Sequence, residues 1–329
     1  MSDESGWSLT ESDPAVFTAL LQSLGCNTLI VDDLWTLDDP ALLSSLQPIH
    51  ALIFLFKWIG GTEDEAADGE LKGGGRYDEA FPGFFAHQVV NDACATIAVL
   101  NGVFNIPSVP MGPDLSQLRE FSAGMDPLMS GYSITNSAAI RNAHNALSSS
   151  ANSPFSIDPS LYDQNEKEDA FHFVVYVPVA GQLYELDGLR RAPVQHGGWE
   201  GGEGWLDVAR RTIQRRIEGY PPGTLQFSLL AVRTDNLPGM EAQLEQARAA
   251  GDEHLASELV HHIYAEKSKR AEWEFENSLR RHNHVGLIHS LLLALAKAGG
   301  LDTAVQKAKQ KMIEARQKAA KSDTKMEED

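Results

Sequence analysis

The sequence predicts an α/β protein of the α+β kind, with a central, mainly antiparallel sheet, flanking helices and an all-helical C-terminal extension. Up to about residue 233, short apolar runs typical of strands are interspersed with segments of 3.6-residue periodicity. Two of the runs flank a two-residue turn, which is the pattern of an antiparallel hairpin. From about residue 240 to 320 the sequence is almost free of proline and rich in Ala, Glu, Lys, Arg and Leu.

Bulk composition narrows the class of protein. The 329 residues are enough for a well-buried core, and 43% of them are hydrophobic. The formal net charge of −19 repels phosphate backbones, so no direct nucleic-acid ligand is expected. The charge suits either a basic protein partner or simple solubility. Two cysteines, Cys26 and Cys94, are too few for a disulfide framework and indicate a reducing compartment.

The sequence patterns of a metal site, a signal peptide and a membrane span are not found. The sequence has neither CxxC nor HExxH, so no metal site and no cofactor are expected. Residues 1–12 carry acids and serines where a signal peptide has a basic and then an apolar segment. The longest apolar run, Ala51 to Phe56, is far too short to span a membrane, and no membrane partner is expected.

The first elements are predicted from caps and periodicity. Asp13-Pro14 starts a helix whose apolar residues repeat every 3.6 positions as far as Gly25. Leu29–Val31 and Ala51–Trp58 are predicted strands, the second one buried because it is continuously apolar. Residues 60–80 are predicted to be a flexible surface insertion, since this glycine-rich stretch lacks the GKS or GKT of a phosphate-binding loop.

The remaining elements follow from the same signals. A helix is predicted from Asn91 to Phe104, with Asn91 or Asp92 as its cap. Ser148–Asp169 is polar and too long for a simple connector, so a functional lid is expected there. The other predicted elements are helices over Leu115–Met125, Ser137–Leu147 and Trp205–Ile217, strands over Phe171–Val179, Leu183–Asp187 and Leu225–Arg233, and a glycine-rich loop over His196–Gly204.

Cys94 lies in the segment FFAHQVVNDACAT, at the predicted start of a helix. A helix N-terminus stabilises a thiolate, and its free backbone N–H groups can hold an oxyanion. Gln88, six residues earlier, offers a side-chain amide as a second oxyanion donor. A cysteine at a helix start is more often an inert small hydrophobe. Both interpretations therefore stay open on this segment alone.

His172 and Asp187 lie on the predicted hairpin. A two-residue turn at Ala180-Gly181 places Asp187 opposite Val174, which makes it a diagonal neighbour of His172 on the same face. An aspartate that holds an imidazole close to a thiolate is the arrangement of nucleophilic catalysis. A three-residue turn would break this geometry, and a strand histidine with no catalytic role is the alternative.

These segments carry a resemblance to a known family. FFAHQVVNDACAT and HFVVYVPVAGQLYELDGL resemble the two signature blocks of the ubiquitin C-terminal hydrolases, which are cysteine-dependent deubiquitinases of papain-like architecture. The resemblance implies that Cys94 is the nucleophile, His172 the general base and acid, Asp187 the residue that orients it, and Gln88 the oxyanion stabiliser. GWSLTESDPAVFTALL, LIFLFKW and NSAAIRNAHNAL extend the match over about residues 6–233.

One position departs from the family pattern, and one loop is matched by position alone. Ile97 stands where the family is expected to have Gln, which is not a catalytic position. In the family, the loop that corresponds to Ser148–Asp169 crosses over the active site and limits what passes through it. The expected domains are a catalytic domain over 6–235, a helical partner-binding domain over 240–305 and a charged, flexible tail over 306–329.

The C-terminal part resembles the longer, proteasome-associated branch of the family. Glu276-Asn277 and RRHNHVGLIHSLLLALAKAG, followed by KAKQK, carry this resemblance. It implies that residues 240–329 bind a ubiquitin-receptor subunit of the proteasome and tune activity, in the cytoplasm and the nucleus. The apolar stripe from Leu287 to Leu295 must be buried, either on such a partner or on the chain's own catalytic domain.

The function implied is hydrolysis of the bond after the C-terminal glycine of ubiquitin, with ubiquitin and its conjugates as partners. Two alternatives remain. One is an interaction module that docks on the proteasome and has weak, regulated or vestigial catalysis. The other is an unrelated cysteine peptidase that acts on peptides. A metal at His282, His284 and His289 is not expected, because no cysteine or paired acid lies at ligand spacing.

Overall fold

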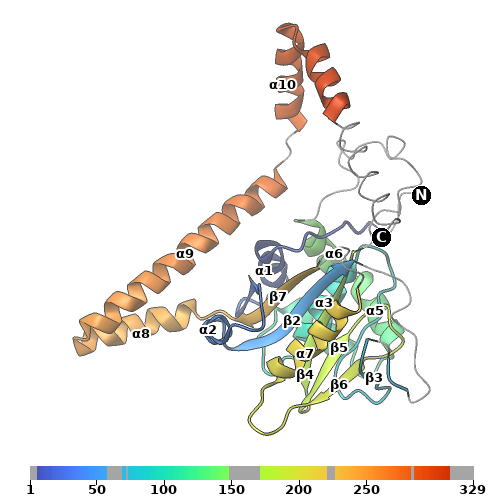
Figure 1. Cartoon of the computed structure of the whole chain (residues 1–329), viewed down its shortest axis with the longest axis vertical. Helices are drawn as coiled ribbons and strands as arrows, with labels where there is room; N and C mark the ends of the chain where they lie inside the picture. Colours follow the sequence, from blue (N-terminus) through green and yellow to red (C-terminus); the bar gives the residue numbers. More distant parts are fainter. Residues whose placement is uncertain are drawn as a thin grey trace, which may run out of the picture. The chain divides into compact units, whose positions relative to one another are not determined.

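The computed structural model of the chain describes residues 6–57, 69–71, 73–147, 171–220, 227–282 and 285–311. Its first compact unit, Met1–Arg281, contains a seven-stranded sheet. The strands are β1 (Leu29–Asp33), β2 (Ile49–Lys57), β3 (Arg76–Tyr77), β4 (Phe171–Val179), β5 (Gln182–Leu186), β6 (Val194–Gly198) and β7 (Phe227–Thr234). Their order is β1-β7-β2-β4-β5-β6-β3, and each pairing is antiparallel (Figure 1). The predicted α+β fold with an antiparallel sheet is confirmed.

Helices precede, interrupt and follow this sheet. The first unit contains α1 (Pro14–Ser23), α2 (Pro40–Ser45), α3 (Cys94–Val103), α4 (Pro113–Phe121), α5 (Pro127–Thr135), α6 (Ala138–Asn145), α7 (Trp205–Glu218), α8 (Leu237–Ala250) and α9 (Glu253–Arg281). The second unit, His282–Asp329, contains α10 (Val285–Lys297).

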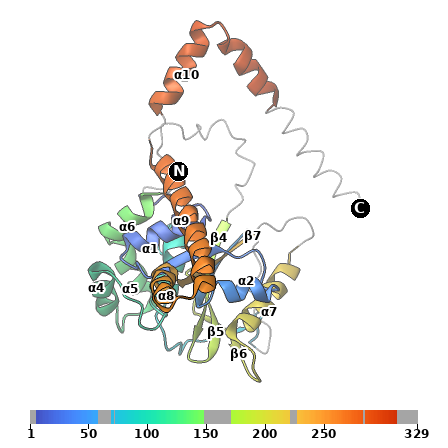
Figure 2. The same cartoon turned by 90° about the vertical axis from the view of Figure 1, so that its left-hand side faces the viewer.

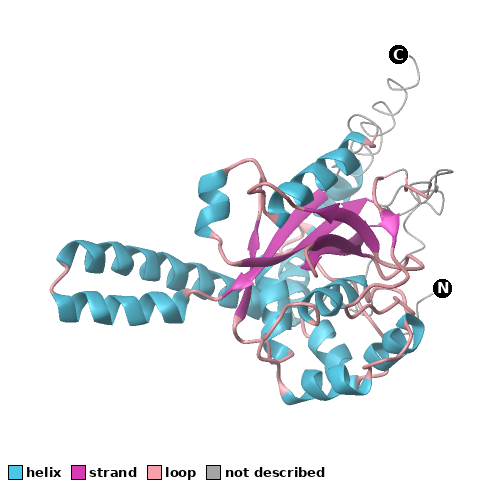
Figure 3. Cartoon of the chain, turned by 90° about the horizontal axis from the view of Figure 1, so that it is seen from below, coloured by secondary structure: helices cyan, strands magenta, loops and turns pink. Residues whose placement is uncertain are grey.

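The core consists of two apolar layers, one on each face of the sheet, and helices cover both faces (Figure 3). On one face, Ile53 of β2 and Val175 of β4 lie in a cluster with apolar residues of α1 and α3. On the other face, Phe54 and Tyr176 lie in a cluster with residues of α7. Because β2 is buried on both faces, its run from Ala51 to Phe56 is apolar without alternation, as a central strand requires.

The start of α1 is the one the sequence predicts. The Asp13 carboxylate accepts hydrogen bonds from the N–H groups of Ala15 and Val16, at 2.8 and 3.2 Å. Pro14 occupies the first turn, where its missing N–H leaves no hydrogen bond unmade. Gly25 follows the helix with a φ of 86°, a left-handed conformation that glycine adopts without strain.

The cap predicted for the helix that carries Cys94 is wrong. Neither Asn91 nor Asp92 caps α3, because Ala93 is the N-cap and makes no side-chain cap hydrogen bond. Asp92 has a φ of 60°, so the backbone turns sharply there, in a region that suits Asp better than most residues. As a result Cys94 is the first residue of the helix.

Short, weakly patterned elements are the ones the sequence analysis missed. The predicted loop His196–Gly204 overlaps the end of β6, and the predicted loop 60–80 contains β3. β6 reads VQHGG and shows no apolar alternation. α2 and α5 were not predicted, and α5 contains a glycine and two serines, which lower helix propensity. The expected lid, Ser148–Asp169, lies outside the described residues.

The predicted helical C-terminal region begins with an antiparallel pair. α8 and α9 lie side by side in both views (Figures 1 and 2) and share a small core that includes Leu244, Ala247, Leu259 and Ile263. Gly251, with a φ of 73°, ends α8 in the left-handed conformation typical of a helix C-terminus. Helical structure is confirmed as far as residue 311.

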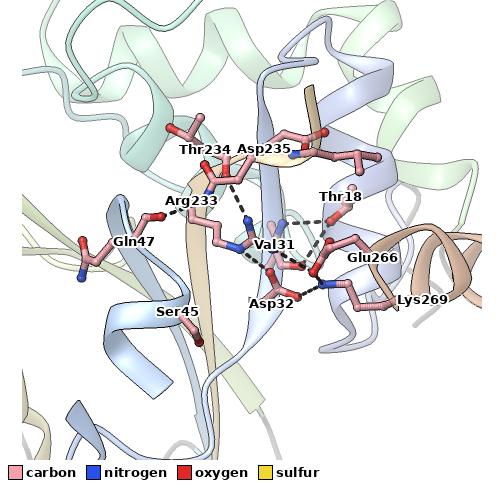
Figure 4. A network of polar contacts seen from close by, with 12 residues as sticks. Thr18, Val31, Asp32, Ser45, Gln47, Arg233, Thr234, Asp235, Glu266 and Lys269 are labelled. Atoms are coloured by element: carbon pink, nitrogen blue, oxygen red, sulfur yellow. Dashed lines mark hydrogen bonds and ion pairs between the residues drawn. The ribbon is translucent and has the colours of Figure 1, made fainter. Parts of the chain in front are cut away.

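Polar contacts attach α9 to β1 and β7. The buried Asp32 of β1 is paired with Arg233 of β7 and, at 2.8 Å, with Lys269 of α9 (Figure 4). Glu266 of α9 lies 3.6 Å from Arg233 and 2.7 Å from Lys269, so four charges of alternating sign bridge the sheet and the helix. We call these contacts, together with those that α9 makes further along towards α1, the α9 seam.

The seam continues along α9 towards α1. Arg270 forms a bidentate pair with Asp235, at 2.6 and 2.7 Å. Near the end of the helix, the Asn277 side chain donates to the Ala15 carbonyl of α1, and Arg280 contacts Asp13 at 2.7 Å. The compact units therefore divide after Arg281, inside the region 240–305 that the sequence assigns to one domain. The predicted boundary at residue 235 stays a prediction.

The second unit is helical in the part that the structure describes. α10 is followed by a helix over Leu301–Lys311, bent by 114° from it. Large apolar side chains of α10 are exposed, among them Leu287, Leu291 and Leu292. Among the described residues, none of the helices is by itself long and apolar enough to cross a membrane, and only this bent pair passes on length and composition. Residues 312–329 of the predicted charged tail lie outside the described ranges.

Candidate active site

The candidate site lies where α3, β4 and β5 come together. Cys94 is the first residue of α3, His172 is the second residue of β4, and Asp187 directly follows β5. α3 contacts both strands, so elements that are far apart in the sequence converge at one place. The three side chains proposed from sequence for catalysis therefore come from three neighbouring elements.

The β4–β5 hairpin has the predicted turn and register. Ala180 and Gly181 have φ values of 48° and 78°, the pair of positive angles typical of a two-residue type I′ turn. Val175 pairs with Leu186, so the next pair along would join Val174 and Asp187. The predicted juxtaposition of Asp187 and His172 is confirmed.

The contact between these two side chains is short and buried. His172 Nε2 lies 2.6 Å from Asp187 Oδ1, with 6% of the His and 1% of the Asp side chain exposed. The same oxygen accepts the Leu189 backbone N–H at 2.9 Å. A carboxylate can only accept here, so the proton lies on Nε2 and the other ring nitrogen, Nδ1, is left to face a reacting group.

His172 is held in its charged form. Burial lowers the pKa of its ring, but hydrogen bonds to Asp187 and Cys94 and the negative charges of both outweigh it and raise that pKa to about 9. At neutral pH the ring with this raised pKa is an imidazolium. The Phe56 ring packs edge-on against His172, with centroids 5.9 Å apart, and restricts its rotation.

The two cysteines have different surroundings. Cys94 is partly exposed and begins α3, where the first backbone N–H groups of the helix have no partner within it. Cys26 is fully buried in the apolar core, and burial raises the pKa of its thiol to about 11. Only Cys94 combines access, a helix N-terminus and a neighbouring imidazolium.

Gln88 is anchored beside the loop that carries Asp187. Its backbone N–H donates to the Gly188 carbonyl at 2.8 Å. A Cβ at Gly188 would lie 2.9 Å from the Gln88 nitrogen and 2.8 Å from the Ile97 side chain, so only glycine allows this approach. Gln88 Oε1 is buried and has no hydrogen-bond partner within the described residues. The oxyanion role of Gln88 stays a prediction.

A group of buried charges, formed by Glu185, Arg190 and Arg216, lies next to the His172–Asp187 pair and was not predicted from the sequence. A weak signal for Glu185 is present in the sequence, since it lies between Tyr184 and Leu186 in the buried part of the strand QLYEL. The two arginines come from a turn and from α7, and no periodic pattern distinguishes them from surface arginines. Within the described ranges, no cluster of three His, Cys, Asp or Glu side chains is arranged to hold a metal ion.

Two family models match the chain. The model described as "Ubiquitin carboxyl-terminal hydrolase, family 1" matches residues 7–218, a stretch that contains Gln88, Cys94, His172 and Asp187. A second model, described as "Ubiquitin carboxyl-terminal hydrolases", matches residues 256–301 and so covers most of α9 and all of α10.

Similar proteins match over nearly their whole length. Ubiquitin carboxyl-terminal hydrolase ubh-4 of Caenorhabditis elegans is 36% identical, over 94% of this chain and 95% of its own. The isozyme L5 of Dictyostelium discoideum is 32% identical, over 96% and 99%. The crystal structure of Trichinella spiralis UCH37 bound to ubiquitin vinyl methyl ester superposes with a TM-score of 0.66 at 34% identity, over 82% of this chain and 99% of that one. Fold, family models and relatives agree, and this chain belongs to the ubiquitin carboxyl-terminal hydrolase family of cysteine peptidases.

Proposed function

We propose that this deubiquitinase cleaves the bond after the C-terminal glycine of ubiquitin with Cys94 as nucleophile. His172 serves as base and acid, Asp187 orients it, and Gln88 helps to hold the oxyanion. The observation that carries the proposal is the buried 2.6 Å contact between His172 and Asp187, next to a cysteine that begins a helix. An aspartate that holds an imidazole near a cysteine is the arrangement used for thiol hydrolysis, which supports these roles.

The reaction follows from these positions. The Cys94 thiolate attacks the glycine carbonyl carbon, and the oxyanion is held by the Cys94 N–H and the Gln88 side-chain amide. His172 gives its proton to the leaving amine as the carbon–nitrogen bond breaks, which leaves a thioester on Cys94. His172, now neutral, takes a proton from water. The hydroxide attacks the thioester, and the released thiolate re-forms the ion pair.

A surface for a protein substrate lies at the same end of the sheet. Phe227 pairs with Phe56, which in turn pairs with His172, so the three residues form one row across β7, β2 and β4. Phe227 is exposed in this row, and Phe171 is exposed in the next one. Trp35, 80% exposed, follows Leu34, whose backbone N–H donates to the Leu229 carbonyl of β7. Exposed aromatic side chains beside a catalytic group are typical of a protein-binding surface.

The decisive experiment compares substrates. A ubiquitin conjugate with a C-terminal fluorogenic group should be turned over by the wild type and not by Cys94→Ala, and a generic fluorogenic peptide should not be cleaved by either. Cleavage of the peptide at a comparable rate would favour an unrelated peptidase. Tight ubiquitin binding without turnover would favour an interaction module.

The second part of the proposal concerns the tail. Residues 240–329 are proposed to bind a ubiquitin-receptor subunit of the proteasome, which places the enzyme in the cytoplasm and the nucleus. The exposed leucines of α10, with the basic KAKQK segment after them, support a helical partner of complementary charge. A chain that ends at Arg281 should keep its turnover and lose co-purification with proteasomes. Retained co-purification would refute this docking role.

A further inference from the structure

A buried network of charges lies directly behind the proposed catalytic pair. It consists of two carboxylates, from Asp187 and Glu185, and two guanidinium groups, from Arg190 and Arg216, each at most 8% exposed. The formal charges of these four groups sum to zero. Buried charges are retained at such a place only when each has a partner of opposite sign, so the removal of one member leaves another uncompensated.

Of the two guanidinium groups in the network, only that of Arg190 contacts the proposed catalytic aspartate, as far as the described residues show. Its Nε lies 3.6 Å from Asp187 Oδ2, the carboxylate oxygen that does not contact His172. Both atoms are buried, and neither has a hydrogen-bond partner within the described residues. The two atoms therefore face each other as a buried pair of opposite charge. The turn is closed by a 3.0 Å backbone bond from the Arg190 N–H to the Asp187 carbonyl.

Glu185 holds Arg190 from the other side. One terminal nitrogen of Arg190 lies 3.5 Å from Glu185 Oε1, and the same oxygen accepts from Arg216 at 2.7 Å. Tyr176 and His196 contact the second oxygen of Glu185, at 3.1 and 3.2 Å. Burial works against the charge of Glu185, but the charges of Arg216 and Arg190 hold its pKa well below the usual range. Arg190 is thus kept in place by a permanent anion.

We propose that Arg190 is a positioning residue for catalysis, whose guanidinium holds Asp187 Oδ2 so that Oδ1 stays aimed at His172. The proposal rests on the proposed role of Asp187. A carboxylate rotates easily about its last bond, because that torsion has only broad minima. A planar guanidinium fixed by Glu185 selects one orientation. Without it, Oδ2 is a buried anionic oxygen with no compensation, and the carboxylate turns to find a partner.

The test is a double-mutant cycle on turnover of the fluorogenic ubiquitin conjugate. Arg190→Gln should lower kcat about 10- to 100-fold, the scale of a misplaced catalytic group, and leave KM unchanged. In an Asp187→Asn background, the same substitution should change kcat by less than about twofold, because the orientation it protects is already lost. Arg191→Gln is the matched control, since its side chain is 58% exposed and contacts Glu79 and Tyr77 at the surface.

Thermal unfolding of each variant shows whether a loss of kcat comes from a misfolded protein or from a misplaced Asp187 in a folded one. If Arg190→Gln does not fold, Arg190→Lys carries the cycle, because it keeps the charge and loses the planar fork. A wild-type kcat in either variant, or an equal loss of kcat in both backgrounds, would overturn the proposal. If kcat falls in Asp187→Asn but stays at the wild-type value in the Arg190 variant, only the role of Arg190 is refuted. Wild-type turnover in Asp187→Asn would refute the proposed triad as well.

Discussion

The candidate active site and the α9 seam are both built from paired charges, but they differ in burial. At the site, His172 and Asp187 are 6% and 1% exposed at the side chain, and the network behind them is enclosed by the sheet and α7. In the seam, Lys269 and Arg270 keep 29% and 26% of their side chains exposed. Among the charged side chains of the seam, Asp32 and Arg233 at its inner end are the most buried, at 9% and 5% exposed.

This difference in burial gives the two sets of charges different roles. Buried pairs are costly to break, because a lone charge is left in a medium that cannot solvate it, and so they hold one geometry. Partly exposed pairs exchange easily for water and contribute little each. The site therefore has a fixed geometry suited to chemistry, whereas the seam is an attachment that several weak contacts share.

The largest expected effect is on turnover. Asp187→Asn should leave the fold intact and lower kcat by roughly 10²- to 10⁴-fold, because the amide no longer holds the imidazole in its charged, oriented form. Steady-state kinetics on the fluorogenic ubiquitin conjugate measure this loss. Asp38→Asn is the matched control, since it breaks the exposed pair with Arg210 and should not change kcat. A loss below threefold at Asp187 would show that burial at the site has no catalytic consequence.

The next effect tests the buried end of the seam. Arg233→Met removes the inner partner of Asp32 and leaves this buried carboxylate only the partly exposed Lys269. It should lower the free energy of unfolding by about 2 kcal/mol, between the scales for an exposed and a buried pair. Urea denaturation measures it. In the control, Arg248→Met breaks the exposed pair with Glu245 and should cost about 0.5 kcal/mol or less. Equal losses in the two variants would erase the distinction between buried and exposed pairs.

A pH profile tests whether Asp187 keeps the His172 ring charged. The folded-state pKa of His172 is raised from 6.5 to about 9, so the charged ring's contribution to stability is complete below about pH 6.5 and is lost as pH rises through 9. Turnover that needs the imidazolium should fall over the same upper range. In Asp187→Asn, the alkaline limb of kcat/KM should move to lower pH. An alkaline limb that stays in place would mean that Asp187 does not stabilise the charged ring.

The smallest effect belongs to the outer seam. Lys269→Ala should cost no more than about 1 kcal/mol of stability at low salt, because Asp32 keeps Arg233 as its partner. At about 1 M salt the cost should shrink, since exposed charges are screened over a few ångströms. Hydrogen exchange of the α9 amides reports whether the helix loosens. A cost that does not depend on salt would show that the seam is not held by exposed charges.

Local features of this chain could be predicted from sequence, and long-range ones could not. The β4–β5 hairpin and the contact of His172 with Asp187 were predictable, because alternation and a two-residue turn fix the register. The cap of α3 was not, because Asp92 adopts a left-handed conformation that its identity permits without requiring. The match to the family added the roles of the site residues, which no pattern in the sequence assigns.

The α9 seam is the clearest example of contacts that could not be predicted from the sequence. Asp32 meets Arg233 and Lys269 across 201 and 237 positions, and nothing local to any of the three indicates the others. The first compact unit extends through α9 to Arg281, inside the region 240–305 that the sequence assigns to one domain. Arg190 was hidden for the same reason, because its meaning depends on Glu185 and Asp187 meeting it in the fold.

Covalent labelling of the wild-type enzyme distinguishes directly between Cys94 and Cys26 as the nucleophile. Ubiquitin that carries a C-terminal vinyl methyl ester should form one adduct, and peptide mass spectrometry should place it on Cys94. Cys26 should stay unmodified, because it is buried and burial raises the pKa of its thiol to about 11. An adduct on Cys26, or a folded enzyme that forms no adduct at all, would contradict the assignment of Cys94 as the nucleophile.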